Sequence, residues 1–144
     1  MSWVRIWIHL VFSTKNRQPL LINEETRNKV FQHIKTNAEN KNIWLEEVNG
    51  YRDHLHCLIS LGRDQTMSKL AQLIKGESSN WINKEKLTKT KFAWQDDYWA
   101  VSVSESHLLR VKKYIQQQVE HHKRKSFTEE VDDFMQKYGW EHLK

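Results

Sequence analysis

The stretch Ile43–Leu61 has the sequence IWLEEVNGYRDHLHCLISL, and it determines the fold that the rest of the chain must fit. Apolar residues recur on both sides of Asn49-Gly50, and an Asn-Gly pair between two such runs is typical of a β-hairpin turn. We therefore predict a strand over residues 43–48, a turn at Asn49-Gly50, and a returning strand over residues 51–61.

The predicted returning strand sorts its side chains into two sets, because successive residues on a strand point to opposite faces. His54 and His56 share one face, with Cα atoms about 7 Å apart. Both imidazoles can therefore reach one metal ion through neutral ring nitrogens. The same pair also fits a polar strand face that binds nothing. The apolar face consists of Leu55, Cys57, Ile59 and Leu61.

The flanking sequence predicts two more strands and four helices from its apolar periodicity and its capping residues. The strands cover residues 3–13 and 92–103. The helices start at Asn23, at Asp64 or Thr66, at Ser104 or Ser106, and at the capping-box sequence Ser126-Phe-Thr-Glu129; the third covers about residues 105–124 and the fourth ends near Gly139. This order of elements predicts an α+β fold, an antiparallel sheet covered by helices, with residues 1–144 in a single domain.

The composition limits the class of protein. The chain has 144 residues, four Gly and one Pro, which is the length of one domain without low-complexity linkers. It shows no apolar run of membrane-spanning length and no cleavable signal pattern, and Cys57 is its single cysteine. We therefore expect a soluble protein of the reducing cytoplasm that contacts no membrane.

A formal net charge of +5 permits binding to nucleic acid without requiring it. Basic residues gather in three places, each of which fits either a DNA contact or a solvated surface. Four lysines lie between residues 84 and 91. We expect DNA contacts from the other two clusters, which are Lys15 with Arg17, and Lys123 with Arg124 and Lys125.

The predicted helix over residues 105–124 carries a second set of candidate functional residues. Beside its apolar stripe of Leu108, Val111, Ile115 and Val119 lies a row formed by His107, Tyr114, Gln118 and His121. Tyr114 and Gln118 are one turn apart and therefore neighbours on the helix surface. This pair also fits ordinary packing of a half-exposed helix, so its chemical interpretation depends on the two histidines.

Together, Tyr114, Gln118 and the histidine pair predict phosphoryl transfer with a metal ion. Two imidazoles and an amide oxygen, with no thiolate, suit Mg²⁺ or Mn²⁺ and leave coordination positions for phosphate and water. Such an ion acts as a Lewis acid on phosphate and assists a phenol, which is a poor nucleophile at neutral pH. A phosphotyrosine ester would allow strand rejoining without ATP, and no Walker loop or other sign of a nucleotide cofactor is present.

Four stretches of the chain also match the pattern of a known family. They are FSTKNR (residues 12–17), GYRDHLHCLI (50–59), WQDDYWAVSVS (94–104), and VKKYIQQQ (111–118) with its continuation EHHKRKSF (120–127). In this order they resemble the HUH (histidine–hydrophobic–histidine) endonucleases that serve as one-tyrosine transposases of small insertion sequences. The resemblance extends from about Trp3 to Tyr138.

The resemblance implies an activity and a set of roles. Tyr114 would be the nucleophile, and His54, His56 and Gln118 would hold the metal ion. The fold would be of the RNA-recognition-motif or ferredoxin-like type, in a homodimer whose tyrosine helix often completes the partner subunit's site. The substrate would be single-stranded DNA with hairpin ends, cut to leave a 5′-phosphotyrosine and a free 3′-OH, in a prokaryotic cell.

Some residues depart from the family's pattern or match nothing catalytic in it. Asp97 stands where a Gly is expected, and Trp99 stands where a smaller residue is common, which affects the local turn and DNA contacts. His107 and His121 are expected to lie on the surface or to face DNA.

Three other interpretations stay open at the level of sequence. The chain could be a non-catalytic sheet domain that binds single-stranded nucleic acid through exposed aromatics. It could be a domesticated nuclease of the same fold, serving its host without a mobile element. It could also be a structural zinc protein, although Cys57, its only thiol, lies on the strand face opposite to the histidines.

Overall fold

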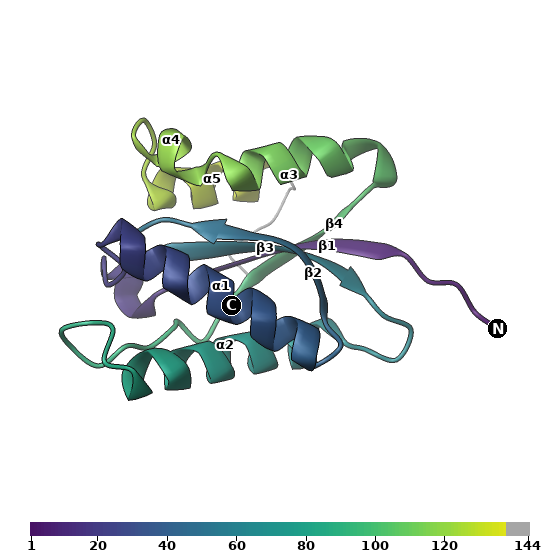
Figure 1. The fold of residues 1–144 in the computed structure, drawn as a ribbon. Helices are drawn as coiled ribbons and strands as arrows, with labels where there is room; N and C mark the ends of the chain where they lie inside the picture. Colours follow the sequence, from purple (N-terminus) through teal and green to yellow (C-terminus); the bar gives the residue numbers. More distant parts are fainter. Residues whose placement is uncertain (138–144) are drawn as a thin grey trace.

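The four strands form one antiparallel sheet in the order β2-β3-β1-β4. In this computed structural model, which describes residues 1–137 apart from the side chains of residues 134 and 135, helices lie on both faces of the sheet (Figure 1). The strands are β1 (Ile6–Ser13), β2 (Trp44–Gly50), β3 (His54–Leu61) and β4 (Trp99–Val103). The α+β class and the antiparallel sheet predicted from the sequence are confirmed.

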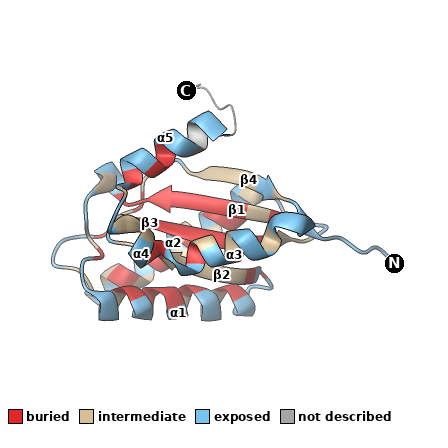
Figure 2. Cartoon of the chain, turned by 90° about the horizontal axis from the view of Figure 1, so that it is seen from above, coloured by how far each residue is buried: buried red, intermediate tan, exposed pale blue. Residues whose placement is uncertain are grey.

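One face of the sheet is covered by α1 (Glu24–Asn40) and α2 (Met67–Lys84). Both helices begin at predicted caps: the Asn23 side chain accepts hydrogen bonds from the backbone of Glu25 and Thr26, and Thr66 accepts one from Lys69. Apolar residues of these helices pack on the strand face that includes Leu55, Cys57 and Ile59. Figure 2 shows that buried residues run along β1 and β3, the two central strands.

The opposite face carries a short 3₁₀ turn, η2 (Glu105–His107), and then α3 (Leu108–Gln116), α4 (Gln118–His122) and α5 (Phe127–Lys137). The prediction of a single helix over residues 105–124 is wrong. The backbone leaves the helical conformation at Gln117, with φ −100° and ψ 23°. The Asn49 side chain of β2 donates hydrogen bonds to the backbone oxygens of Ile115 and Gln116 at 2.9 and 3.2 Å. It thereby satisfies carbonyls that a continuing helix would use.

The hairpin turn lies later in the chain than predicted. Asn49 and Gly50 are the last residues of β2, Gly50 pairs with Leu55, and the turn consists of residues 51–53. The backbone approaches very closely here, because a Cβ at Gly50 would lie 2.2 Å from the carbonyl oxygen of His54. The glycine is therefore required by the spacing of the two strands and not by the turn itself.

The predicted outer strands are also too long. β1 begins at Ile6, and only residues 99–103 of the predicted strand over 92–103 pair with the sheet, apart from one bridge between Thr14 and Trp94. Asn83 of α2 binds both backbone groups of Phe92, at 2.7 and 2.9 Å, and so holds this segment on the helix. The predicted helix end at Gly139 lies outside the described residues, and within residues 1–137 no helix is long and apolar enough to cross a membrane.

Candidate active site

His54 and His56 project from β3 toward the face covered by α3, α4 and α5, and both side chains are fully buried. Their outward nitrogens are held by other residues: His54 Nδ1 lies 2.8 Å from Asp53 Oδ1, and His56 Nδ1 lies 2.8 Å from His9 Nε2. Each Nε2 therefore faces the interior of the site, which is the arrangement in which a second residue orients a metal-binding imidazole.

Gln118 joins the two histidines because of the helix break at Gln117. It is the first residue of α4, its side chain is fully buried, and its Oε1 lies 3.0 Å from His54 Nε2. An amide oxygen and an imidazole nitrogen at this separation suit adjacent ligands of one small cation, for which about 3.0 Å is expected when the metal–ligand bonds are about 2.1 Å. The residues predicted to hold a metal ion thus fit that purpose.

Tyr114 lies on the adjacent turn, in α3, and its hydroxyl donates a hydrogen bond to Glu130 Oε2. Glu130 belongs to the first turn of α5 and is only 2% exposed. Its other oxygen, Oε1, lies 3.1 Å from His56 Nε2 and 3.6 Å from His54 Nε2. One carboxylate therefore links the tyrosine to the histidine pair.

Sequence reasoning missed Glu130. The capping box at Ser126 and Glu129 located the start of the helix correctly, and its reciprocal hydrogen bonds are present at 3.1–3.4 Å. An acidic residue next to a cap is ordinary, however, because acids are favoured at helix N-termini. Only the path of the chain after α4 brings this one to the histidines.

Two more histidines complete the cluster. His121 Nε2 lies 3.2 Å from Glu130 Oε2 and 3.4 Å from the Tyr114 hydroxyl, while its ring stays partly exposed, so the expectation that it lies on the surface or faces DNA stays a prediction. His122 Nε2 lies 3.5 Å from Glu130 Oε1. His107, by contrast, is exposed, and its Nδ1 contacts the Ser104 hydroxyl at 2.7 Å.

Burial sets the charges of these groups. It raises the pKa of Glu130 to about 7, against the opposing effect of His54. It lowers the pKa of His122 to about 4, together with repulsion from His54 and His121, and it holds the pKa of His56 well below the usual value. These imidazoles are therefore neutral at physiological pH, which is the form that can bind a metal ion.

Tyr114 is also accessible from solvent. It lines a surface pocket of about 570 Å³ together with Gln117, Glu120, His121, Arg124 and Lys125. Two of the predicted DNA-binding residues, Arg124 and Lys125, are therefore beside the tyrosine, although Lys125 also forms an ion pair with Asp133.

The other predicted DNA-binding residues lie elsewhere. Lys123 pairs with Glu120 at 3.0 Å and does not line the pocket, and Lys15 is exposed. Arg17 is half-buried against α5, where it donates to the Thr128 hydroxyl at 2.9 Å and covers the ring of Phe127.

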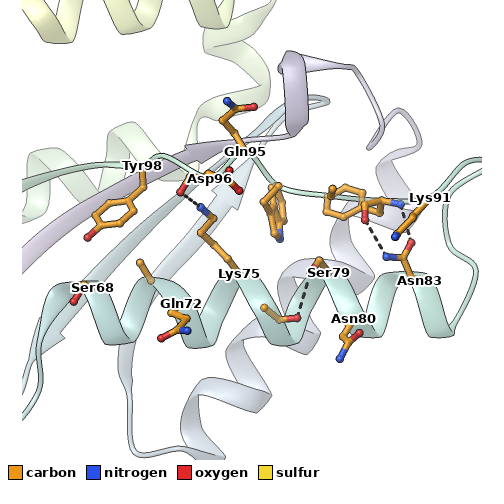
Figure 3. A pocket seen from close by; sticks show the side chains of 15 residues that line it. Ser68, Gln72, Lys75, Ser79, Asn80, Asn83, Lys91, Gln95, Asp96 and Tyr98 are labelled. Atoms are coloured by element: carbon orange, nitrogen blue, oxygen red, sulfur yellow. Dashed lines mark hydrogen bonds between the residues drawn. The ribbon is translucent and has the colours of Figure 1, made fainter. Parts of the chain in front are cut away.

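A second hollow of about 510 Å³ lies between α2 and residues 91–98 (Figure 3). Amide side chains such as Gln72 and Asn80 line it, and Lys75 bridges it by donating to the backbone oxygen of Asp96 at 2.8 Å. None of the residues in the tyrosine and histidine cluster contributes to this groove. The cluster is therefore the candidate active site.

The fold and this cluster are those of a class of protein that comparisons with known proteins identify. Residues 2–118 match the sequence profile of the family described as "Transposase IS200 like". The chain belongs to this family of transposases, and this confirms the resemblance to one-tyrosine HUH transposases stated from the sequence.

Individual relatives agree with the family. The transposase for insertion sequence element IS200 of Salmonella typhimurium is 26% identical over 120 residues, which cover 80% of this chain and 78% of the relative. The crystal structure of a candidate transposase from Deinococcus radiodurans has the same fold, with a TM-score of 0.65, 20% identity, and coverage of 82% of this chain and 95% of that one. A REP-associated tyrosine transposase, solved with a REP hairpin bound to it, gives a TM-score of 0.63 at 16% identity, covering 85% and 72%.

Proposed function

We propose that this transposase cleaves and rejoins single-stranded DNA by nucleophilic attack of Tyr114 on a backbone phosphate. The observation that carries the proposal is the position of the Tyr114 hydroxyl. It lies between a buried cluster of imidazoles and carboxylate on one side and an open pocket with Arg124 and Lys125 on the other. A nucleophile, a proton acceptor and a phosphate-binding surface therefore meet at one oxygen atom.

The strand transfer follows from these groups. Glu130 Oε2, which already accepts the Tyr114 hydrogen bond, takes the proton as the phenol oxygen attacks phosphorus. The bond from phosphorus to the 3′ oxygen breaks, the 3′ oxygen leaves and takes a proton from solvent water, and the DNA stays attached as a 5′-phosphotyrosine. A 3′-hydroxyl from another strand end reverses these steps and releases Tyr114, so rejoining needs no ATP.

His54, His56 and Gln118 would hold a divalent cation, Mg²⁺ or Mn²⁺, in this site. When bound, the ion polarises the scissile phosphate and neutralises the negative charge that develops on its oxygens. Asp53 and His9 fix the rings of the two histidines, each at 2.8 Å, so the nitrogens are oriented before the ion arrives.

The partner that we propose is single-stranded DNA with hairpin ends, in the cytoplasm of a prokaryotic cell. The related REP-associated transposase, which has the same fold, is described as bound to a hairpin. Basic side chains at the pocket and at the turn near Lys15 suit a phosphate backbone. We also propose a homodimer, since β4 is an edge strand of the sheet and a second copy could pair with it.

A covalent-adduct assay tests the proposal. Purified protein is incubated with hairpin-ended single-stranded DNA and Mn²⁺ and separated under denaturing conditions. We expect a protein–DNA adduct that disappears with chelator and in Tyr114→Phe, and that persists in Tyr98→Phe, whose ring lines the other groove. Binding without any adduct would favour the non-catalytic alternative, and an adduct formed by Tyr114→Phe would assign the attack to another residue.

A further inference from the structure

The buried cluster contains a polar atom with no hydrogen bond. His122 Nε2 is buried and forms none with any residue among those that the structure describes. Its nearest charged neighbour is Glu130 Oε1, at 3.5 Å, and both side chains are only 2% exposed. Leaving such an atom without a partner costs free energy, so an unpaired buried donor or acceptor in a native structure calls for a partner such as a bound ion or water.

Glu130 Oε1 is the second unusual atom, because three imidazole nitrogens surround it. His56, His122 and His54 place Nε2 at 3.1, 3.5 and 3.6 Å from this oxygen. The ligand atoms of the four residues all lie within 4.8 Å of one another. A carboxylate oxygen and imidazole nitrogens are common ligands of divalent transition metals.

The separations match the edges of a coordination shell. Adjacent ligands are about 3.0 Å apart around an octahedral ion and about 3.4 Å apart around a tetrahedral one, when the bonds are about 2.1 Å long. The 3.1 Å distance from His56 Nε2 to Glu130 Oε1 and the 3.0 Å distance between His54 Nε2 and Gln118 Oε1 lie in this range. The distances from His122 and His54 to Glu130 Oε1, 3.5 and 3.6 Å, exceed its upper end by 0.1–0.2 Å.

We infer that His122 Nε2 and Glu130 Oε1 are further ligands of the divalent cation, beside His54, His56 and Gln118. This inference rests on the proposed function, because it assumes that the site binds such an ion. It gives Glu130 two roles through two oxygens, since Oε1 faces the ion and Oε2 holds the Tyr114 hydroxyl. Five protein ligands would leave room for one phosphate oxygen on a six-coordinate ion.

Helix α5 is held in the position that this role requires. Phe127 and Val131 are buried against Val11, and the Phe127 ring is stacked on that of His54 with centroids 4.3 Å apart. Trp99 packs edge-on against Phe127 from β4. The position of Glu130 is therefore fixed by apolar packing on both sides of its helix turn.

These two ligands also lie outside the segment that defines the family. The family match ends at residue 118, after the histidine pair, Tyr114 and Gln118. His122 and Glu130 follow it, on α4 and α5. On this inference, α4 and α5 contribute ligands to the metal site.

Calorimetric titration of the purified full-length protein with Mn²⁺ tests the inference. Mn²⁺ is the probe because imidazole nitrogens bind it more readily than Mg²⁺. We expect Glu130→Gln and His122→Gln each to weaken Mn²⁺ binding roughly tenfold or more, since even residues that only orient a ligand contribute that much. Asp132→Asn is the matched control for Glu130→Gln, because it also removes one carboxylate charge, and His107→Gln is the control for His122→Gln, because it also removes one imidazole ring. Asp132 and His107 are both exposed. Their affinity should stay within about twofold of the wild type.

The outcomes separate this inference from the proposed function. If the wild type and the controls bind Mn²⁺ and both Glu130→Gln and His122→Gln bind it equally well, the inference is wrong and the proposed function stands. Tighter Mn²⁺ binding by Glu130→Gln would also overturn the inference, because Glu130 would then compete with the ion for the histidine nitrogens. If the wild type itself binds no Mn²⁺, the metal-dependent function fails first.

A crystal of the wild-type protein grown with Mn²⁺ provides a test that needs no variant to fold. The anomalous peak should lie about 2.1–2.3 Å from His122 Nε2 and Glu130 Oε1. A peak bound by His54, His56 and Gln118 with water in the remaining positions would contradict the inference.

Discussion

His54 Nε2 and Gln118 Oε1 lie 3.0 Å apart although 64 positions separate the two residues in the sequence. The break at Gln117 produces this contact, because it starts a new helix at Gln118 whose first side chain is buried against β3. Asn49 supports the break from β2 by binding the last carbonyls of α3. The hairpin of β2 and β3 therefore supplies the two histidines and also helps to position Gln118.

Gly50 should be essential for the hairpin geometry that places His54. Gly50→Ala would put a methyl group 2.2 Å from the His54 carbonyl oxygen, so the strands must separate. We expect a loss of about 1–3 kcal/mol in the free energy of unfolding, as is usual for overpacking, together with weaker Mn²⁺ binding. Chemical denaturation and calorimetry measure the two effects.

Gly76→Ala is the control for that substitution. Its Cβ would meet no atom within 4 Å in α2, so it should stabilise the protein by up to about 1 kcal/mol through helix propensity. Equal stabilities for the two alanine variants would show that the close approach at Gly50 has no consequence.

His9 should act on the metal site through His56. Its Nε2 lies 2.8 Å from His56 Nδ1, which must carry the proton when His56 binds an ion through Nε2. His9→Phe removes this acceptor and should weaken Mn²⁺ binding about tenfold, whereas His9→Gln, which retains an acceptor, should lose less. Unchanged Mn²⁺ affinity in a folded His9→Phe protein would limit His9 to a packing role.

Arg124 should contact the DNA backbone at the tyrosine pocket. Each phosphate contact with a single strand contributes about 0.7 to the slope of log affinity against log salt. Arg124→Gln should therefore lower that slope by about 0.7 in a fluorescence anisotropy titration. Lys123→Gln, which loses a residue paired with Glu120 outside the pocket, should lower it less. A larger decrease of the slope in Lys123→Gln than in Arg124→Gln would place the DNA on the other side of α4.

Cys57 should be chemically inert in the folded protein. Its thiol is fully buried on the strand face opposite to the histidines, and burial raises its pKa far above the usual value. We expect no reaction with a thiol reagent under native conditions and one equivalent after denaturation. Rapid labelling of the native protein would mean that β3 opens readily.

The sequence predicted the parts of the site that follow from local periodicity. Alternation along residues 51–61 placed His54 and His56 on one face and Cys57 on the other, as the structure shows. Helical spacing placed Tyr114 and Gln118 on adjacent turns, although the helix between them is broken. The family assignment from motifs in order is confirmed by the match over residues 2–118.

The remaining parts depend on contacts between distant segments, which periodicity does not reveal. The break at Gln117 arises where Asn49 binds α3, and the extended segment before β4 is held by Asn83. Glu130 reaches the histidines only because the chain turns back between α4 and α5. The local sequence does not distinguish a buried acidic residue in the first turn of a helix from an exposed one.

The most direct measurement for the central claim is mass spectrometry of the trypsin-digested protein–DNA adduct. Cleavage after Lys113 and Lys123 separates Tyr114 from every other tyrosine, in the peptide YIQQQVEHHK. Attack by Tyr114 predicts a nucleotide phosphate on this peptide alone, linked through the tyrosine oxygen to the 5′ end. A nucleotide found on the peptides that contain Tyr51 or Tyr98, with the Tyr114 peptide unmodified, would contradict the account.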